Sequence, residues 1–178
     1  MVEIEFYARN VVSSVPVGIY WGLLGLLVVG SLVLIWWKGF WQGLRYGVLL
    51  LLTEWVSLVL CAIVFFRETG TERGYNLMPF WSYWDYGGHD YLMEMLGENI
   101  LNVLLFVPIG FLAGCGLRGM TLKKALILGG GLSVIIELLQ FIFKKGFCET
   151  DDVIHNVLGC IIGYYICRLI VMRQCLNV

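Results

Sequence analysis

Five long apolar stretches constrain this chain more than any other feature. They occupy residues 17–37, 46–66, 100–117, 125–143 and 153–171. A helix that crosses a hydrocarbon core of about 30 Å needs about 20 predominantly apolar residues, and such a helix satisfies its own backbone polar groups inside the bilayer. The sequence therefore predicts an all-α fold, a polytopic transmembrane bundle of about five helices. No repeat or polar linker divides the chain, so we expect a single membrane domain over residues 1–178.

The composition excludes a water-soluble domain. Hydrophobic residues make up 60% of the chain and charged residues 14%, with a mean hydropathy of +0.83. Soluble domains have about 45–50% apolar and about 25% charged residues. The sequence has no glycine-rich phosphate loop and no basic stretch typical of nucleic-acid binding, so we expect membrane lipids or lipid-linked molecules as partners and no nucleic acid.

The basic residues predict the orientation of the bundle. Three alternate connections carry Lys and Arg without any carboxylate: Lys38 and Arg45, then Arg118, Lys123 and Lys124, then Arg168 and Arg173. The other set, formed by the N-terminus and residues 67–99 and 144–152, holds five basic and eleven acidic residues. Because short loops rich in Lys and Arg stay in the cytoplasm, we predict the N-terminus outside and the C-terminus inside.

With this orientation, three consecutive helices carry polar residues at the same depth, near the outer leaflet. These residues are Asn102 on the third helix, Glu137 and Gln140 on the fourth, and Asp151, Asp152, His155 and Asn156 at the start of the fifth. The stripe formed by Gly159 and Gly163 lies below Asn156, and small residues allow helices to approach closely. We therefore predict packed helices with an outward-facing polar pocket above them.

The polar residues have two interpretations. A charged carboxylate at the centre of a membrane helix costs about 2.5–3.5 kcal/mol on insertion scales, so Glu137 should be protonated, paired or bound to a ligand. The alternative is that Glu137, Gln140, Asn102 and Asn156 are interhelical hydrogen-bonding groups, each contributing about 0.6 kcal/mol. Should the site be catalytic, Glu137 or Asp152 is the expected general base.

Metal binding is a further alternative at this site. Asp151 and His155 are four residues apart and could share a helix face, and carboxylates with imidazole suit a divalent cation. No spaced metal motif is present, however. The competing reading is that Asp151 and Asp152 only stabilise the N-terminus of the fifth helix. The sequence leaves a cofactor and any catalysed reaction undetermined.

Four segments carry a resemblance to a known family. They are NLMPF at 76–80, ENILNVLLFVPIGFL at 98–112, SVIIELLQ at 133–140 and DDVIHNVLGCIIGY at 151–164. In this order they resemble the VanZ-like family of bacterial membrane proteins, over about residues 73–172. The family pattern falls on Asn76, Pro79, Phe80, Asn102, Phe106, Pro108, Gly110, Glu137, Gln140, Asp152, Asn156 and Gly159.

The resemblance implies a multi-pass protein of the bacterial cell membrane. The family's namesake is associated with resistance to the glycopeptide teicoplanin, a drug with a lipid tail that acts at the outer leaflet. Many relatives have an arginine after the glutamine, whereas this chain has Lys144 and Lys145. A lysine attracts phosphate as a point charge and cannot reproduce the bidentate contact of a guanidinium group.

We therefore expect an outer-leaflet polar pocket that binds, and in one version modifies, a lipid-linked or amphiphilic envelope molecule. The predicted contacts to its headgroup are Asn102, Gln140, Asn156, Asp151 and His155, with Glu137 and Asp152 as the reactive groups and Lys144 and Lys145 as phosphate-attracting groups. A small transporter or flippase that uses Glu54 is one alternative. A non-enzymatic scaffold that acts through the aromatic connection of residues 67–99, with Trp81 and Trp84, is another.

Overall fold

The computed structural model describes residues 16–65, 69–70, 72–84 and 88–176 of the chain. Five helices in this part are long and apolar enough to cross a membrane. They are α2 (Val17–Lys38), α3 (Phe40–Leu60), α4 (Gly88–Gly116), α5 (Leu122–Phe143) and α6 (Thr150–Leu176). The predicted all-α bundle of five membrane helices is therefore confirmed, and the chain is a multi-pass membrane protein.

The helices begin earlier than the apolar stretches suggested. We predicted the second span from residue 46, the third from 100 and the fifth from 153, whereas α3 begins at Phe40, α4 at Gly88 and α6 at Thr150. The last turn of the second span widens into a π-helix over Cys61–Phe65. Hydropathy detects only the part of a helix that suits hydrocarbon, and polar residues at its ends continue the same backbone hydrogen bonding. The connection predicted over residues 67–99 therefore ends where α4 begins.

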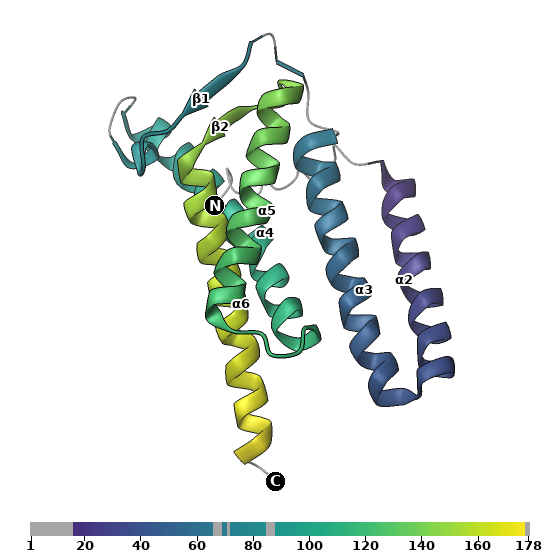
Figure 1. The fold of residues 1–178 in the computed structure, drawn as a ribbon. Helices are drawn as coiled ribbons and strands as arrows, with labels where there is room; N and C mark the ends of the chain where they lie inside the picture. Colours follow the sequence, from purple (N-terminus) through teal and green to yellow (C-terminus); the bar gives the residue numbers. More distant parts are fainter. Residues whose placement is uncertain (1–15, 66–68, 71, 85–87, 177–178) are drawn as a thin grey trace.

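A small sheet at one end of the bundle was not predicted. Strand β1 (Gly74–Asn76) pairs in parallel with β2 (Phe147–Glu149), with Tyr75 opposite Cys148. A short 3-10 turn, η2 (Trp81–Tyr83), follows β1. Figure 1 shows both strands at the upper end of the bundle, where α5 ends and α6 begins. The sheet brings the segment before α4 next to the segment between α5 and α6.

Helices α4 and α6 form the centre of the bundle. Helix α5 packs on α6, α3 packs on α4, and α2 packs on α3 at the edge (Figure 1). The buried core includes Phe106, Ile109 and Ala113 of α4 and Cys160 of α6. Large apolar side chains elsewhere on the helices are exposed, as expected for surfaces that face lipid.

Glycines set the close contact between α4 and α6. A Cβ atom added to Gly110 would lie 1.9 Å from the carbonyl oxygen of Cys160, and one added to Gly163 would lie 1.9 Å from that of Val107. Such distances are far below van der Waals contact, so only glycine fits at these positions. The packing predicted from the small-residue stripes is present.

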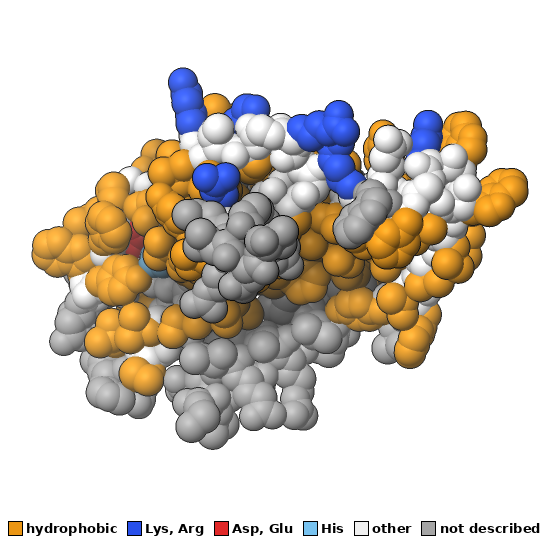
Figure 2. All heavy atoms as spheres, turned by 90° about the horizontal axis from the view of Figure 1, so that it is seen from below, with side chains coloured by type: hydrophobic (Ala, Val, Ile, Leu, Met, Phe, Trp, Pro, Cys, Tyr) orange, Lys and Arg blue, Asp and Glu red, His pale blue; other side chains and the backbone are white. Residues whose placement is uncertain are grey.

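Basic residues gather at the opposite end of the bundle from the sheet. Lys38 ends α2 and Arg45 lies near the start of α3, beside the α2–α3 turn; Arg118 lies in the α4–α5 turn, and Lys123 and Lys124 lie in the first turn of α5. Both turns lie at the lower end in Figure 1, and Figure 2, seen from below, shows Lys and Arg side chains on this face. Arg45 Nε donates a hydrogen bond of 2.8 Å to the carbonyl oxygen of Gly116, which joins the two turns.

Candidate functional site

Polar side chains at the upper end of the bundle form two hydrogen-bonded groups. We call the first the loop clamp; it consists of Ser82, Tyr83, Asn99, Asp151 and His155. We call the second the polar cluster; it consists of Asn102, Ser133, Glu137, Glu149, Asp152 and Asn156. The two groups meet at the start of α6, where Asp151 belongs to the clamp and Asp152 to the cluster.

The loop clamp is built around the fully buried carboxylate of Asp151. It accepts hydrogen bonds from the backbone amide of Phe80, from the amide of Ser82 at 3.0 Å and from Ser82 Oγ at 2.5 Å. Asn99 Nδ2 of α4 donates to the same Ser82 Oγ at 2.9 Å. Asp151 therefore attaches the 3-10 turn to both α6 and α4.

The clamp also holds an unfavourable backbone conformation. Phe80 has φ +62°, in the left-handed region that residues with a Cβ rarely adopt. Its amide donates to Asp151, and its ring is exposed at the surface. Because a residue in this region costs about 1–3 kcal/mol, the buried hydrogen bonds to Asp151 must offset that cost.

His155 fixes the other end of the turn. Its Nδ1 lies 2.6 Å from the carbonyl oxygen of Asp151, and its Nε2 lies 2.6 Å from Tyr83 Oη. A carbonyl oxygen only accepts, so Nδ1 carries the hydrogen, and in the neutral ring Nε2 accepts from the Tyr83 hydroxyl. Burial raises the pKa of Tyr83. A hydrogen bond from Asn99 lowers this pKa in part, and the negative charge of Asp151 raises it. The phenol is therefore held as a donor.

The polar cluster connects four elements through three hydrogen bonds. Asn102 Nδ2 of α4 donates to Asp152 Oδ1 of α6 at 2.8 Å. Asn156 Nδ2, one turn further along α6, donates to Ser133 Oγ of α5 at 2.8 Å. The backbone amide of Glu149 in β2 donates to Glu137 Oε2 at 2.8 Å.

Carboxyl groups are concentrated around β2. Burial raises the pKa of the Glu149 carboxyl to about 7, and the charges of Asp152 and Glu98 add to the effect. Burial also raises the pKa of the neighbouring Cys148 thiol, assisted by Glu137 and Asp152. Carboxyl groups from α4, α5, β2 and α6 thus act on the same small volume. Such a volume favours a cation or a hydrogen-bond donor as its occupant.

One buried atom of the cluster is unsatisfied. Asn156 is 3% exposed, and among the described residues its Oδ1 has no hydrogen-bond partner. A buried acceptor without a donor costs about 1–3 kcal/mol. The amide is held by Ser133 at its nitrogen, which leaves its buried oxygen without a donor among the described residues.

The structure separates the predicted site residues into three sets. It brings Asn102, Glu137, Asp152 and Asn156 together in the polar cluster, and it places Asp151 and His155 in the loop clamp. Gln140 is buried in the last turn of α5, where its backbone carbonyl oxygen accepts from the backbone amides of Lys144 and Lys145. The two lysines follow α5 and are partly buried.

Sequence reasoning missed Ser82, Tyr83 and Glu149. The only signal for Ser82 was a lone hydroxyl in an aromatic stretch, and Glu149 lay in a loop without a predicted strand. Glu54 lies on α3, outside the contacts that define the cluster. Among the described residues, no group of three or more His, Cys, Asp and Glu side chains is arranged to hold a metal ion.

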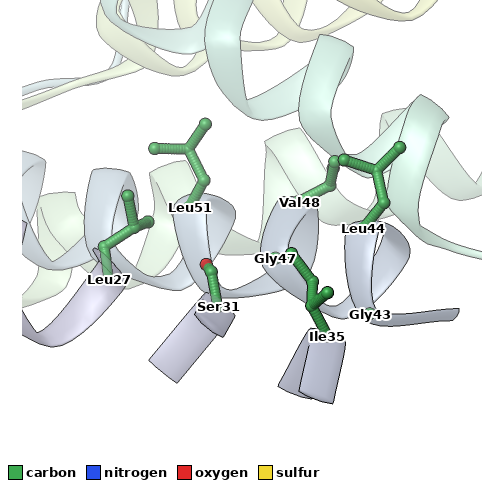
Figure 3. A pocket seen from close by; sticks show the side chains of 8 residues that line it. All are labelled: Leu27, Ser31, Ile35, Gly43, Leu44, Gly47, Val48 and Leu51. Carbon is green, nitrogen blue, oxygen red and sulfur yellow. The ribbon is translucent and has the colours of Figure 1, made fainter. Parts of the chain in front are cut away.

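A hollow in the structure lies away from the polar cluster. It is a cavity of about 220 Å³ between α2 and α3, towards the end that carries the basic turns. Figure 3 shows its lining, which is apolar except for the hydroxyl of Ser31: Leu27, Ser31, Ile35, Gly43, Leu44, Gly47, Val48 and Leu51. The outward-facing polar pocket stays a prediction.

The part of the chain that resembles known proteins includes the site. The family model described as VanZ/LLP1 matches residues 48–171, a range that contains the loop clamp, the polar cluster and both glycine stripes but not α2. Protein VanZ of Enterococcus faecium is 33% identical to this chain over 94 residues, which are 52% of this chain and 51% of the relative. The match thus spans about half the length of that protein. No solved structure matches the chain.

Proposed function

Because the chain belongs to the VanZ/LLP1 family, we propose that its polar cluster binds the headgroup of a lipid-linked or amphiphilic envelope molecule. The protein acts at the bacterial cell membrane, with the cluster at the outer leaflet and the C-terminus in the cytoplasm. Through this binding it contributes to glycopeptide resistance, as the similarity to Protein VanZ suggests. The position of the basic turns at the opposite end supports this orientation, since such turns stay inside.

The observation that carries the proposal is the convergence of carboxyl groups from separate elements in one place. Glu137 is 3% exposed, and Asp152 and Glu149 lie close enough to affect the same thiol. Interhelical hydrogen bonds contribute only about 0.6 kcal/mol each, whereas like charges brought close together disfavour one another. Hydrogen bonding between helices alone therefore does not explain why acidic groups converge here.

The surroundings of the cluster suit an amphiphile. The side chains of Tyr75, Phe80, Tyr83 and Trp84 are exposed beside the loop clamp. Aromatic side chains of this kind favour the headgroup region of a bilayer. The polar headgroup of such a ligand would contact the carboxyl and amide groups of the cluster. Its apolar tail would contact this aromatic surface or the surrounding lipid.

Native mass spectrometry of the protein, released gently from its membrane, tests the proposal. The wild type should retain a specific envelope lipid, and Glu137→Gln should lose it. This substitution removes the charge while its oxygen can still accept from the Glu149 amide, so the fold should persist. The matched control is Glu54→Gln, which removes a carboxylate from α3 outside the cluster and should retain the lipid.

Two results would contradict the binding site. Bulk phospholipid in equal amounts on all three proteins would leave interhelical hydrogen bonding as the role of the cluster. Loss of a specific lipid in Glu54→Gln, with retention in Glu137→Gln, would instead favour a transport route through α3.

A further inference from the structure

Two thiols meet at the lower part of the contact between α4 and α6. Cys115, in the last turn of α4, and Cys167 of α6 have their sulfur atoms 3.0 Å apart. Cys167 is 2% exposed, whereas Cys115 is exposed on the outside of the helix pair. The two residues are 52 positions apart in the sequence, so the tertiary packing alone brings them together.

The glycine contact between the helices holds the thiols in register. A Cβ atom added to Gly114, the residue before Cys115, would lie 3.0 Å from both Cβ and Sγ of Cys167. Gly110 and Gly163 bring the two backbones into direct contact further along the same helices. A disulfide has an S–S bond of about 2.0 Å, and the two sulfur atoms already lie 3.0 Å apart. Linking them therefore requires the sulfur atoms to approach by roughly 1 Å.

We propose that Cys115 and Cys167 are a modification site, a thiol pair that a hydroperoxide converts into a disulfide linking α4 to α6. Cys115, the more exposed of the two thiols and next to the end of the membrane-spanning part of α4, attacks one peroxide oxygen and gives up its proton; the O–O bond breaks, Cys115 becomes a sulfenic acid, and the other oxygen takes the proton and leaves as water or an alcohol. Cys167 then attacks the Cys115 sulfur, and the hydroxyl leaves as water with the Cys167 proton. Two thiols are oxidised and one peroxide is reduced.

The link has a mechanical consequence for the bundle. Helix α4 carries Asn102 and helix α6 carries Asp152, and the disulfide would fix the two helices at the end opposite this pair. The basic turns lie at the thiol end, which the proposed orientation places towards the cytoplasm. Thiols there are normally kept reduced, so the link would form under oxidative conditions. The thiol pair itself does not depend on the proposed ligand.

Thiol counting and peptide mapping test the inference on the full-length protein in lipid nanodiscs. After treatment with hydrogen peroxide, unfolding and labelling with a maleimide, the wild type should fall from six labelled cysteines to four, since the chain has six. Dithiothreitol should restore all six. Mass spectrometry of the digest should identify one linked peptide pair, which joins Cys115 to Cys167.

Variants distinguish this pair from the other cysteines. Cys148→Ser, at the far end of the bundle, should still lose two labelled thiols on oxidation, whereas Cys115→Ser should lose none. The oxidised wild type should also unfold at a higher temperature than the reduced protein, and Cys115→Ser should show no such difference. Retention of all six thiols by the wild type, or a link mapped to any other cysteine, would overturn the proposal even if a variant failed to fold.

Discussion

Replacing Asp151 by Asn should release the turn that precedes α4. In the native protein its carboxylate accepts from the amides of Phe80 and Ser82 and from the Ser82 hydroxyl. An asparagine keeps one acceptor oxygen and presents an NH₂ group in place of the other. In one orientation of this amide its nitrogen faces the Phe80 amide, and in the other it faces the Ser82 amide and hydroxyl, so a donor loses its acceptor in either case.

The magnitude follows from the bonds that are lost. Hydrogen bonds to a charged group contribute about 1.5–3 kcal/mol each, and at least one of the three bonds loses its acceptor. The turn should therefore open more easily by about 1.5–3 kcal/mol, and every 1.4 kcal/mol is about tenfold in an equilibrium. The left-handed conformation of Phe80 would no longer be supported, which favours opening further.

Hydrogen exchange of the protein in nanodiscs measures this opening directly. Peptides that contain Phe80 and Ser82 should exchange about 10- to 100-fold faster in Asp151→Asn. Peptides from the centre of α6 should be unchanged. Asp152→Asn is the matched control, because it removes the same charge from the same helix turn but contacts Asn102 instead. Equal protection of the turn in the wild type and in Asp151→Asn would refute the role assigned to the clamp.

Two further predictions concern the helix contact and the charge near β2. Gly163→Ala should abolish folding or lower the free energy of unfolding by about 1–3 kcal/mol through overpacking, because its Cβ would lie 1.9 Å from the Val107 carbonyl oxygen. Gly131→Ala is the control and should be tolerated, since nothing lies within 4 Å of its added Cβ. Thermal unfolding of both variants checks this prediction. The folded pKa of Glu149, about 7, lies above its ordinary value of 4.5, so the folded state binds the extra proton. Thermal stability should therefore fall as pH rises from about 4.5 to about 7, and Glu149→Gln should flatten that part of the curve; a slope of the opposite sign would contradict the assigned burial.

The sequence was sufficient to predict the helices because the bilayer imposes a simple requirement on length and hydropathy. It was not sufficient to locate their starts. The first turns of α4 precede the hydrophobic stretch and include Glu94 and Glu98, which hydropathy assigns to a loop. The two strands could not be predicted because each has only three residues, too few to show the alternation of apolar and polar residues that is typical of a strand.

The meeting of polar residues from three helices was predictable, but their partners were not. Orientation and helix position place Asn102, Glu137 and Asn156 at one depth. In the structure Asn102 donates to Asp152 and Asn156 donates to Ser133. Glu137 was expected to be protonated, paired or bound to a ligand. In the structure its Oε2 accepts from the backbone amide of Glu149, which lies in β2, the strand that pairs with β1. Residue types alone do not predict a hydrogen bond from a backbone amide, and the strand that holds this amide was itself not predicted.

Asp151 and Asp152 show why adjacent acidic residues can carry separate roles. Successive residues on an α-helix point about 100° apart, so one carboxylate turns to the loop clamp and the other to Asn102 of α4. Loss of the first should free the aromatic turn while the contact between α4 and α6 persists. Loss of the second should alter the charge of the polar cluster while the turn stays in place. Ligand retention measured in Asp152→Asn and Asp151→Asn therefore separates binding by the cluster from presentation of the aromatic surface. If only Asp151→Asn lost the ligand, the aromatic turn rather than the carboxyl groups would be the main contact.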